Sequence, residues 1–460
     1  MPADEQRSGD PYEGEGVTAP EGFSRPWLRS DKAVVSQVIA PVERFLRLEV
    51  GSGFLLLAAA AAALVWANVS QGGYEDAWHT EISLTVGNLE LREDLRHWIN
   101  DLLMALFFCL IALEVKREVL FGELKDRKLA VVPIAAAVGG MVVPALVYLG
   151  INASGGTPDG WAIPLATDVA FALAVLAMIG RLAPGPLRAL LLTVAIVDDI
   201  GTIVVIALFY SGGLELAWLG GAAGVVAAIL VMQRLSIRHL AAYVIAAGLL
   251  WLAIFESGVH GTIAGVIVGL LTPARPFHDP DETGKTIAEQ IDDIVEAPDE
   301  PLEEEAMRQA SRLSREAISP LSRLEEALHP WTAYAVLPLF ALANAGVALS
   351  LSSIADTITE PIGLGIILGL VVGKPLGLLA GSALAVKVGG RLPKGVDWPA
   401  LGALGMLAGI GFTVALFISA LAFESGNELE QAKIAVLLAS LCAAAISATA
   451  FAARRLVARR

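Results

Sequence analysis

The stretch Leu187–Ser211, LRALLLTVAIVDDIGTIVVIALFYS, decides the fold. It is long enough to cross a bilayer as one helix, because a helix rises about 1.5 Å per residue. Near its middle stand two adjacent carboxylates, Asp198 and Asp199. A charged residue at the centre of a membrane helix costs about 2.5–3.5 kcal/mol on insertion scales. The pair therefore needs water, a partner or an ion, and it indicates a functional site.

The composition places this stretch in an all-α polytopic membrane protein. Of the 460 residues, 55% are hydrophobic, and they form runs of membrane-span length. The net charge of −15 gathers in the N-terminal tail and in one loop, Pro276–Glu326. This acidic balance excludes nucleic acid as a partner, since there is no basic patch to bind it. We expect no cofactor.

About twelve transmembrane helices follow a polar tail, 1–48. Their approximate limits are 50–70, 95–121, 129–150, 160–182, 187–211, 214–233, 238–256, 260–273, 329–349, 362–386, 398–423 and 431–453. The chain then divides into a first membrane half (49–275), an acidic loop (276–327), a second membrane half (328–456) and a basic tail (457–460).

The connecting loops alternate between those that carry several Lys and Arg residues and those with few or none. The loop after residue 121 and the C-terminal tail are basic, whereas the turns near Gly155, Gly212 and Ser257 lack basic residues. By the positive-inside rule, this pattern predicts that both termini are cytoplasmic, which requires an even number of spans.

Two segments outside the membrane stand out. Residues 83–91, SLTVGNLEL, alternate polar and apolar side chains around Gly87–Asn88, which predicts a short external hairpin. It either pairs with a second copy to make a homodimer or forms a local cover over its loop. The acidic loop 276–327 is expected to be a solvated linker with one helical patch, Glu303–Arg315.

Four ionisable groups share a depth near the middle of their spans: Asp168, Asp198, Asp199 and Lys374. The two adjacent aspartates point about 100° apart on a helix, so they cannot face the same partner. Our hypothesis is that Asp198 pairs with Lys374 while Asp199 faces a water-filled cavity.

Helix breakers interrupt the fourth and eleventh spans. Pro164 stands four residues before Asp168, and Gly409 and Gly411 precede Thr413. Irregular backbone at membrane depth persists only where protein or a cavity surrounds it, and paired interrupted spans indicate the binding site of a transporter. We expect Asp168 to offset an electropositive half-helix N-terminus and Lys374 an electronegative C-terminus.

Carboxylate and hydroxyl oxygens suit a hard cation. Burial favours the protonated form of a carboxylate, whereas a bound Na⁺ favours the charged form. A proton and a sodium ion therefore compete for one site, and this competition joined to alternating exposure gives exchange.

The chain resembles the NhaA family of Na⁺/H⁺ antiporters over roughly Glu49–Leu456. The matching stretches are WINDLLMALFFCLIALEVKREVL (98–120), PLATDVAFAL (164–173), VDDIGTIVVIALFYS (197–211), GVHGTIAGVIVGL (258–270), LHPWTAYAVLPLFALANAGV (328–347), VGKPLG (372–377) and GIGFTVALFISALAF (409–423). Several long matches in one order make the resemblance specific.

The resemblance implies inverted repeats, with two discontinuous helices that cross at mid-membrane. Asp198 and Asp199 would bind Na⁺ and protons, with Asp199 the more direct ligand. Thr167 and Asp168 would lie at the crossing and Lys374 would be their basic partner. The protein would sit in the inner membrane of a prokaryote, surrounded by lipid, and expel Na⁺ or Li⁺ electrogenically in exchange for H⁺.

The resemblance also implies activation at alkaline pH. The cytoplasmic cluster that controls it corresponds to Glu114, Glu118, Glu325 and His329. Glu326 stands where well-known members carry a second histidine, and a glutamate usually does not titrate near neutrality. The residue change and the long acidic loop before it both bear on the pH at which activity begins.

Two other functions remain open at this stage. The same fold would also serve another cation/proton exchanger or a sodium-coupled transporter, although Lys374 favours the electrogenic cation exchanger. A membrane enzyme of the prenyltransferase type uses paired aspartates to hold Mg²⁺, but it needs further acids and a basic diphosphate pocket. Buried titratable pairs also fit proton coupling better than a passive channel. We therefore expect a transporter rather than an enzyme.

Overall fold

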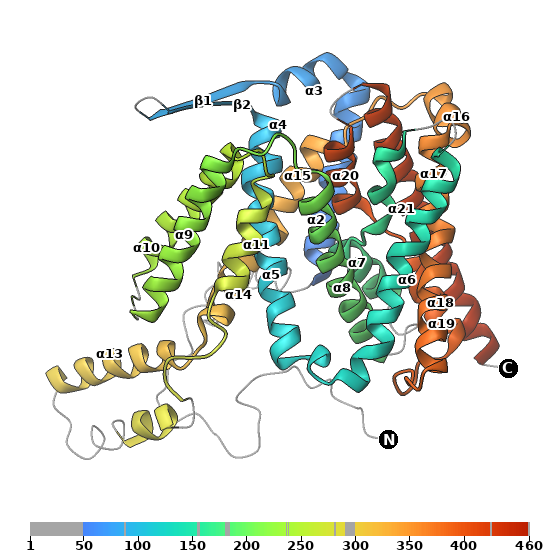
Figure 1. Cartoon of the computed structure of the whole chain (residues 1–460). Helices are drawn as coiled ribbons and strands as arrows, with labels where there is room; N and C mark the ends of the chain where they lie inside the picture. Colours follow the sequence, from blue (N-terminus) through green and yellow to red (C-terminus); the bar gives the residue numbers. More distant parts are fainter. Residues whose placement is uncertain are drawn as a thin grey trace, which may run out of the picture.

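The computed structural model describes residues 49–86, 89–153, 157–179, 185–235, 237, 239–279, 282–289, 300–423 and 426–458. The predicted tail 1–48, the turn residues Gly87–Asn88 and the last two residues of the predicted basic tail lie outside this part of the chain. The rest is almost entirely helical (Figure 1), which confirms an all-α polytopic membrane protein.

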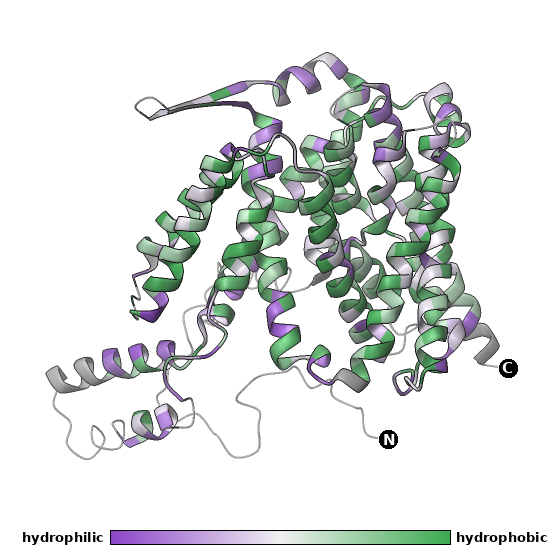
Figure 2. Cartoon of the chain, viewed as in Figure 1, coloured by the Kyte–Doolittle hydropathy of each residue, from purple (hydrophilic) through white to green (hydrophobic). Residues whose placement is uncertain are grey.

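Seven helical segments within the described ranges are long and apolar enough to span a membrane. They are α2 (Glu49–Val69), α4–η3–α5 (Leu95–Trp98, Ile99–Leu103, Met104–Phe121), α6 (Arg127–Asn152), α8 (Gly185–Phe209), α9 (Leu216–Arg234), α17–η8–α18 (Pro361–Leu368, Gly369–Gly373, Lys374–Lys387) and α21 (Asn427–Ala458). Figure 2 shows that apolar residues cover these helices along their middle parts.

Two further spans are bent pairs of shorter helices. The first pair joins η5 (Pro158–Leu165) to α7 (Val169–Ile179) at 42°, and the second joins α19 (Trp398–Ala408) to α20 (Phe412–Ala422) at 48°. The breaks fall where Pro164 and the Gly409–Gly411 segment predict them. With each pair taken as one span, the described residues contain up to nine spans.

The shorter apolar helices occupy the places of the other predicted spans. They are α10 (Leu240–Glu256) and α11 (Thr262–Leu271). The predicted span 329–349 begins at the end of α14 (Pro320–Trp331) and continues through η7 (Thr332–Val336) and α15 (Leu337–Asn344). The count of twelve spans stays a prediction.

Glycines allow the central helices to approach closely. Gly377 and Gly381 of α18 lie against α6 so tightly that a Cβ on either would collide with the α6 backbone at Gly139 or Ala135. Gly269 of α11 lies in the same way against the Cys109 carbonyl of α5. In lipid, helices associate through such close packing of small residues, because apolar burial gives little driving force there.

Helices α9 and α10 stand apart from the main bundle (Figure 1). They pack on each other and on α11 around Ala222, Leu250, Ile254 and Ala264, which form a hydrophobic cluster separate from the main core. Only about a tenth of the apolar stretch of α9 is buried (11%). Most of α9 is therefore free to face lipid or another protein chain.

The segments outside the bundle lie at its two ends (Figure 1). One end carries α3 (Gln71–Trp78), the antiparallel pair β1 (Glu81–Val86) and β2 (Leu89–Asp94), and α16 (Leu351–Thr359). The other end carries the short η4 (Glu123–Lys125), a helical turn at 282–289 and α13 (Glu300–Glu316). The hairpin is longer than the predicted 83–91, and α13 contains the predicted helical patch.

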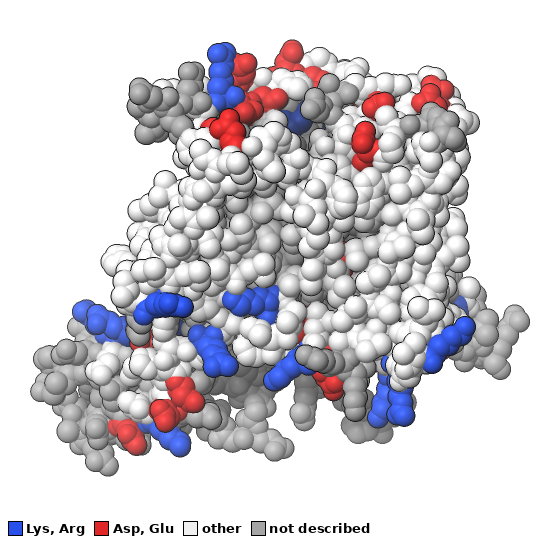
Figure 3. Space-filling view, in the orientation of Figure 1, with Lys and Arg blue, Asp and Glu red and all other residues white. Residues whose placement is uncertain are grey.

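Charge separates the two ends. On the face drawn in Figure 3, most Lys and Arg side chains gather at the end that carries α13. The hairpin end carries mainly acidic side chains, and the band between them is almost free of charge.

Candidate functional site

The two broken helices meet at their breaks. The backbone N–H of Asp168, between η5 and α7, donates to the Ile410 carbonyl at 2.7 Å. The Thr167 hydroxyl lies 2.9 Å from the Ala408 carbonyl, at the end of α19. These contacts satisfy backbone groups that the breaks leave without helical partners, as burial in an apolar surrounding requires.

Asp168 caps two helices at once. Its Oδ1 accepts the backbone N–H of Phe171 at 2.9 Å in the first turn of α7. Its Oδ2 accepts both the backbone N–H (3.0 Å) and the hydroxyl (2.5 Å) of Thr413 in the first turn of α20. A carboxylate is favourable at a helix N-terminus, where unpaired N–H groups and the helix dipole are electropositive. Asp168 is thus positioned to offset both half-helix N-termini.

Lys374 makes the complementary contacts. Its Nζ lies 2.7 Å from Asp198 Oδ2, and both side chains are completely buried. The same ammonium donates to the carbonyl of Leu165, the last residue of η5. A cation is favourable at a helix C-terminus. The π-helical turn η8 immediately precedes Lys374, and such turns often mark functional sites.

Asp198 and Asp199 have different surroundings although they are adjacent on α8. Asp198 Oδ2 lies near Lys374 and 2.9 Å from the Thr167 hydroxyl, and its Oδ1 is buried without a partner among the described residues. The Thr167 hydroxyl has one proton, so it donates either to Asp198 or to the Ala408 carbonyl. Asp199 keeps 6% of its surface exposed and, in the described part of the chain, no hydrogen bond or ion pair holds it. Asp199 is therefore the member of the pair that is available to a ligand.

This arrangement offers oxygen ligands for a hard cation. No group of three or more His, Cys, Asp or Glu side chains within the described ranges is placed to hold a metal ion. The oxygens near the breaks are the carboxylates of Asp168, Asp198 and Asp199, the hydroxyls of Thr167 and Thr413, and backbone carbonyls. The water-filled cavity that we expect beside Asp199 stays a prediction.

The structure brings together only some of the five predicted pH-sensing residues. Arg117 of α5 forms an ion pair with Glu325 of α14, and Glu114 lies close enough to Glu325 for their charges to repel. The side chains of Glu326 and His329 are exposed, and His329 still lies near enough to Glu325 for their charges to interact. The fifth predicted member, Glu118, accepts the backbone N–H of Glu123 at 2.8 Å.

Glu325 lies on α14 before the predicted span that begins at residue 329, and its environment changes its acidity. Burial raises the pKa of its carboxyl above the ordinary range, and the nearby charges of Arg117 and His329 oppose this rise. Arg117 was missing from the sequence-based set, and its spacing from Glu114 along one helix face is the signal that indicates it.

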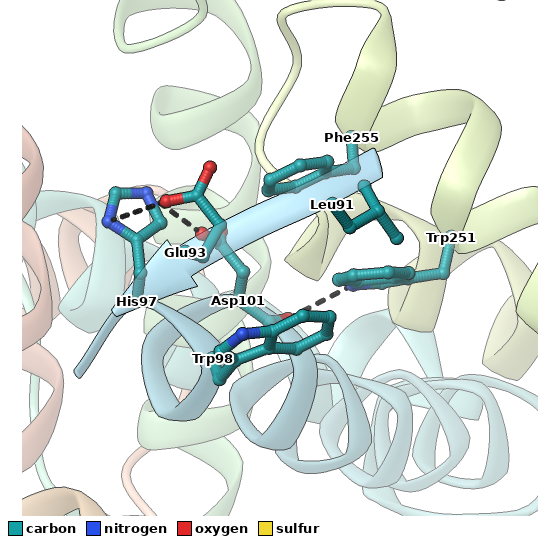
Figure 4. Close-up of a pocket in the computed structure, with 7 residues that line it drawn as sticks. All are labelled: Leu91, Glu93, His97, Trp98, Asp101, Trp251 and Phe255. Atoms are coloured by element: carbon teal, nitrogen blue, oxygen red, sulfur yellow. Dashed lines mark hydrogen bonds and ion pairs between the residues drawn. The ribbon is translucent and has the colours of Figure 1, made fainter. Parts of the chain in front are cut away.

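A second polar cluster, at the hairpin end of the α4–η3–α5 segment, was not predicted. Figure 4 shows a small hollow at the end of β2, lined by Leu91, Glu93, His97, Trp98, Asp101, Trp251 and Phe255. Asp101 is 7% exposed, and its carboxylate lies 3.4 Å from His97 and 3.9 Å from His260. The only local signal was a single acid within an apolar run, WINDLLM.

Comparison with known proteins gives one consistent family. A family model described as Na⁺/H⁺ antiporter 1 matches residues 43–451. Na(+)/H(+) antiporter NhaA 2 of Sorangium cellulosum is 44% identical over 439 residues, which is 94% of this chain and 93% of the relative. NhaA antiporters of Janthinobacterium sp. (strain Marseille) and Rhodopirellula baltica are 42% and 44% identical, over 90% and 89% of this chain and 93% of each relative.

Proposed function

The chain belongs to the NhaA family of Na⁺/H⁺ antiporters, and on that basis we propose that it expels Na⁺ and Li⁺ in exchange for protons by alternating access. It is a multi-pass membrane protein of a bacterial transporter family rather than an enzyme. The exchange would serve sodium and pH homeostasis at the inner membrane.

One observation carries the proposal: Asp199 has no bonding partner in the described chain, beside an Asp198 whose charge Lys374 already balances. In this account, Asp199 binds either a proton or a cation. Asp198 and the Thr167 hydroxyl then supply further ligand oxygens for the cation. This hydroxyl lies 2.9 Å from Asp198 Oδ2. Competition between proton and cation at the same oxygens makes the two movements exclusive, which is the requirement for exchange.

The same pair accounts for electrogenic exchange. When Asp198 leaves its ion pair with Lys374 and takes up a proton, each carboxylate holds one proton. Binding of one Na⁺ to the two carboxylates then releases two protons. More positive charge then enters with protons than leaves with sodium, so the membrane potential helps to drive sodium out.

The broken helices supply the part that changes exposure. Their breaks are joined by hydrogen bonds of Thr167 and Asp168 rather than by continuous helix. We infer that they cross at mid-membrane within inverted repeats, in a twelve-span chain whose halves are 49–275 and 328–456. The basic residues at the α13 end support the proposal that the termini and the loop 276–327 are cytoplasmic and that the β1–β2 hairpin is external.

Two further proposals concern regulation and assembly. Deprotonation of the cytoplasmic cluster around Glu325 at alkaline pH would activate exchange, with Glu114, Glu118, Glu326 and His329 contributing to the field around it. The unpaired edges of β1 and β2 would join with those of a second copy to give a homodimer, because an isolated two-stranded hairpin is marginal alone.

The test is ion-driven proton movement in proteoliposomes. Purified protein is reconstituted with a pH-sensitive dye inside, and Na⁺, Li⁺ or K⁺ is added outside at several pH values. The proposal predicts proton movement with Na⁺ and Li⁺ but not with K⁺, faster when valinomycin and K⁺ dissipate the opposing potential. A response to K⁺ alone would support another cation exchanger, and no response to any cation would contradict the proposal.

A further inference from the structure

One buried hydroxyl beside the carboxylate pair has no hydrogen-bond partner among the residues that the structure describes. Thr202 lies on α8, three residues after Asp199 and four after Asp198, and it is 1% exposed. Within the described part of the chain, its Oγ1 bonds to no protein atom. A buried hydroxyl without a partner destabilises a fold, so its presence calls for a functional explanation.

Thr262 of α11 and Ser382 of α18 also have buried hydroxyls without a partner among the described residues, but they are not adjacent to the carboxylate pair in sequence. Several other buried helical hydroxyls behave differently. Those of Thr193, Thr357 and Ser419 donate to the carbonyl four residues earlier on their own helices, at 3.0, 2.7 and 2.7 Å. This is the ordinary way in which a helical threonine or serine is satisfied. Thr202 has the same option at the carbonyl of Asp198 and does not use it. Its hydroxyl is therefore turned away from the backbone of α8.

Thr202 shares the helix face of the carboxylates. Around the helix axis it lies about 40° from Asp198 and about 60° from Asp199, between the two, and about 4.5 Å beyond Asp199 along the axis. The rest of this face is apolar and buried, with Val194 and Ile206 each 1% exposed. The hydroxyl is thus the third polar group on a face that otherwise packs like ordinary core.

The oxygens on this face are close enough to share one ion. Side chains three or four residues apart on a helix have Cβ atoms about 5–6 Å apart. A hard cation bridges such oxygens at ligand distances of about 2.3–2.6 Å, as Ca²⁺ does. Asp198 Oδ1 also has no partner among the described residues, so it and Thr202 Oγ1 are both available.

We propose that the Thr202 hydroxyl is a ligand of the transported cation and favours Na⁺ over Li⁺. This inference rests on the proposed exchange function, because it assigns one ligand of that cation site. Hydroxyl oxygen is a hard donor suited to an alkali cation. The larger Na⁺ has room for more oxygens than Li⁺, so losing one neutral ligand weakens Na⁺ binding more.

The experiment measures Na⁺ and Li⁺ binding to purified full-length protein by isothermal titration calorimetry at alkaline pH. Thr202→Val removes the hydroxyl and keeps the shape, and Thr202→Ser keeps the hydroxyl. Thr193→Val is the matched control, since Thr193 is on the same helix, is 4% exposed, and is bonded to its own backbone. We expect the Kd for Na⁺ to rise about five- to tenfold in Thr202→Val, with a smaller rise for Li⁺. Thr202→Ser and Thr193→Val should stay within about twofold of the wild type.

A second measurement separates a ligand from a structural hydroxyl. If Thr202 has no partner until a cation binds, Thr202→Val melts at the same temperature as the wild type or higher when Na⁺ is absent. A structural hydrogen bond would make this variant melt lower. An unchanged Na⁺ affinity in Thr202→Val, an equal loss in Thr193→Val, or a lower melting temperature without Na⁺ would each overturn the inference.

The same data distinguish this inference from the exchange function. A wild type that binds Na⁺ in a Thr202-dependent way but moves no protons in vesicles would contradict exchange while the ligand assignment holds. Exchange that proceeds with unchanged Na⁺ affinity in Thr202→Val would overturn the ligand assignment alone.

Discussion

The Lys374 ammonium lies 2.7 Å from a carboxylate oxygen of Asp198, and neither side chain has exposed surface. Two opposite charges buried together are tolerated because each compensates the other, although both lose their hydration. The ammonium also contacts the end of η5, so it joins α18 to one of the broken helices. Lys374 therefore both balances the buried charge of Asp198 and links α18 to the broken helix that contains η5.

Removing one member of this pair should destabilise the protein. Lys374→Gln leaves the Asp198 charge buried and unpaired, and we expect a loss of about 3–5 kcal/mol in the free energy of unfolding. Thermal melting in detergent, followed by size-exclusion chromatography, measures the change. The double variant Asp198→Asn/Lys374→Gln should recover much of the loss, because no charge is then left unpaired. Equal melting of wild type and Lys374→Gln would show that the pair does not hold the fold.

Asp168 should contribute to stability as a shared cap. Asp168→Ala removes the acceptor of three hydrogen bonds at two helix N-termini, and each lost cap costs about 1 kcal/mol or more. Asp397→Ala is the control, because Asp397 caps only α19 and its side chain is 55% exposed. Thermal melting should fall clearly more in Asp168→Ala. Equal falls would mean that Asp168 acts as an ordinary single cap.

The dependence of stability on pH should reveal Glu325. Because its pKa is raised in the folded state, the folded protein holds this proton over a pH range in which the unfolded chain releases it. Its contribution to stability is therefore fully present below the ordinary glutamate pKa and is lost as pH rises through the raised value. Glu325→Gln should therefore reduce the fall in melting temperature between these two pH values.

The exposed neighbour supplies the control for Glu325. Glu326→Gln should keep the wild-type dependence of melting temperature on pH. In vesicles, Glu325→Gln should also reduce the rise of exchange activity with pH, since glutamine mimics the protonated carboxyl. If Glu325→Gln left the pH profile of activity unchanged and Glu326→Gln altered it, the pH switch would involve Glu326, and the prediction for Glu325 would be wrong.

The acidic loop should be removable. The backbone N–H groups of Phe277 and His278 donate to the Glu316 carbonyl at 3.1 and 3.4 Å, so the segment leaves and re-enters the bundle at one place. Replacing residues 279–315 with a short Gly/Ser linker should leave folding and Na⁺/H⁺ exchange intact. Melting temperature and exchange rate measure this. Loss of exchange with normal melting would instead assign the loop a direct part in transport.

The main features of the fold were accessible from sequence because they depend on local composition. Runs of apolar residues predict spans, and Pro164 and Gly409 mark the breaks because they weaken helical hydrogen bonding. The carboxylate pair is also a local signal, since two charges in one span are costly. The positions of these residues within the elements therefore follow from patterns of a few residues.

The contacts between distant segments had no such local signal. Asp168 bonds to Thr413 across 245 positions, and Thr167 reaches Ala408 across 241. Asp101 of η3 lies near His260, just before α11, where α11 packs on the neighbouring α5. In the sequence, Thr202 resembles any threonine of an apolar span. Only the structure shows that its hydroxyl has no hydrogen-bond partner among the described residues. These relationships depend on packing between helices, which composition and spacing do not determine.

The most direct test compares wild type, Asp198→Asn and Asp199→Asn in inverted membrane vesicles. Proton movement on addition of Na⁺ is recorded by fluorescence dequenching across a pH series, with matched amounts of protein in the membrane. Thr193→Val serves as a fourth sample, because its change lies on the same helix but outside the pair. The account predicts Na⁺-dependent proton movement in wild type and Thr193→Val and its loss in both aspartate variants. Undiminished movement in Asp199→Asn would contradict the central claim that this carboxylate pair carries the exchange.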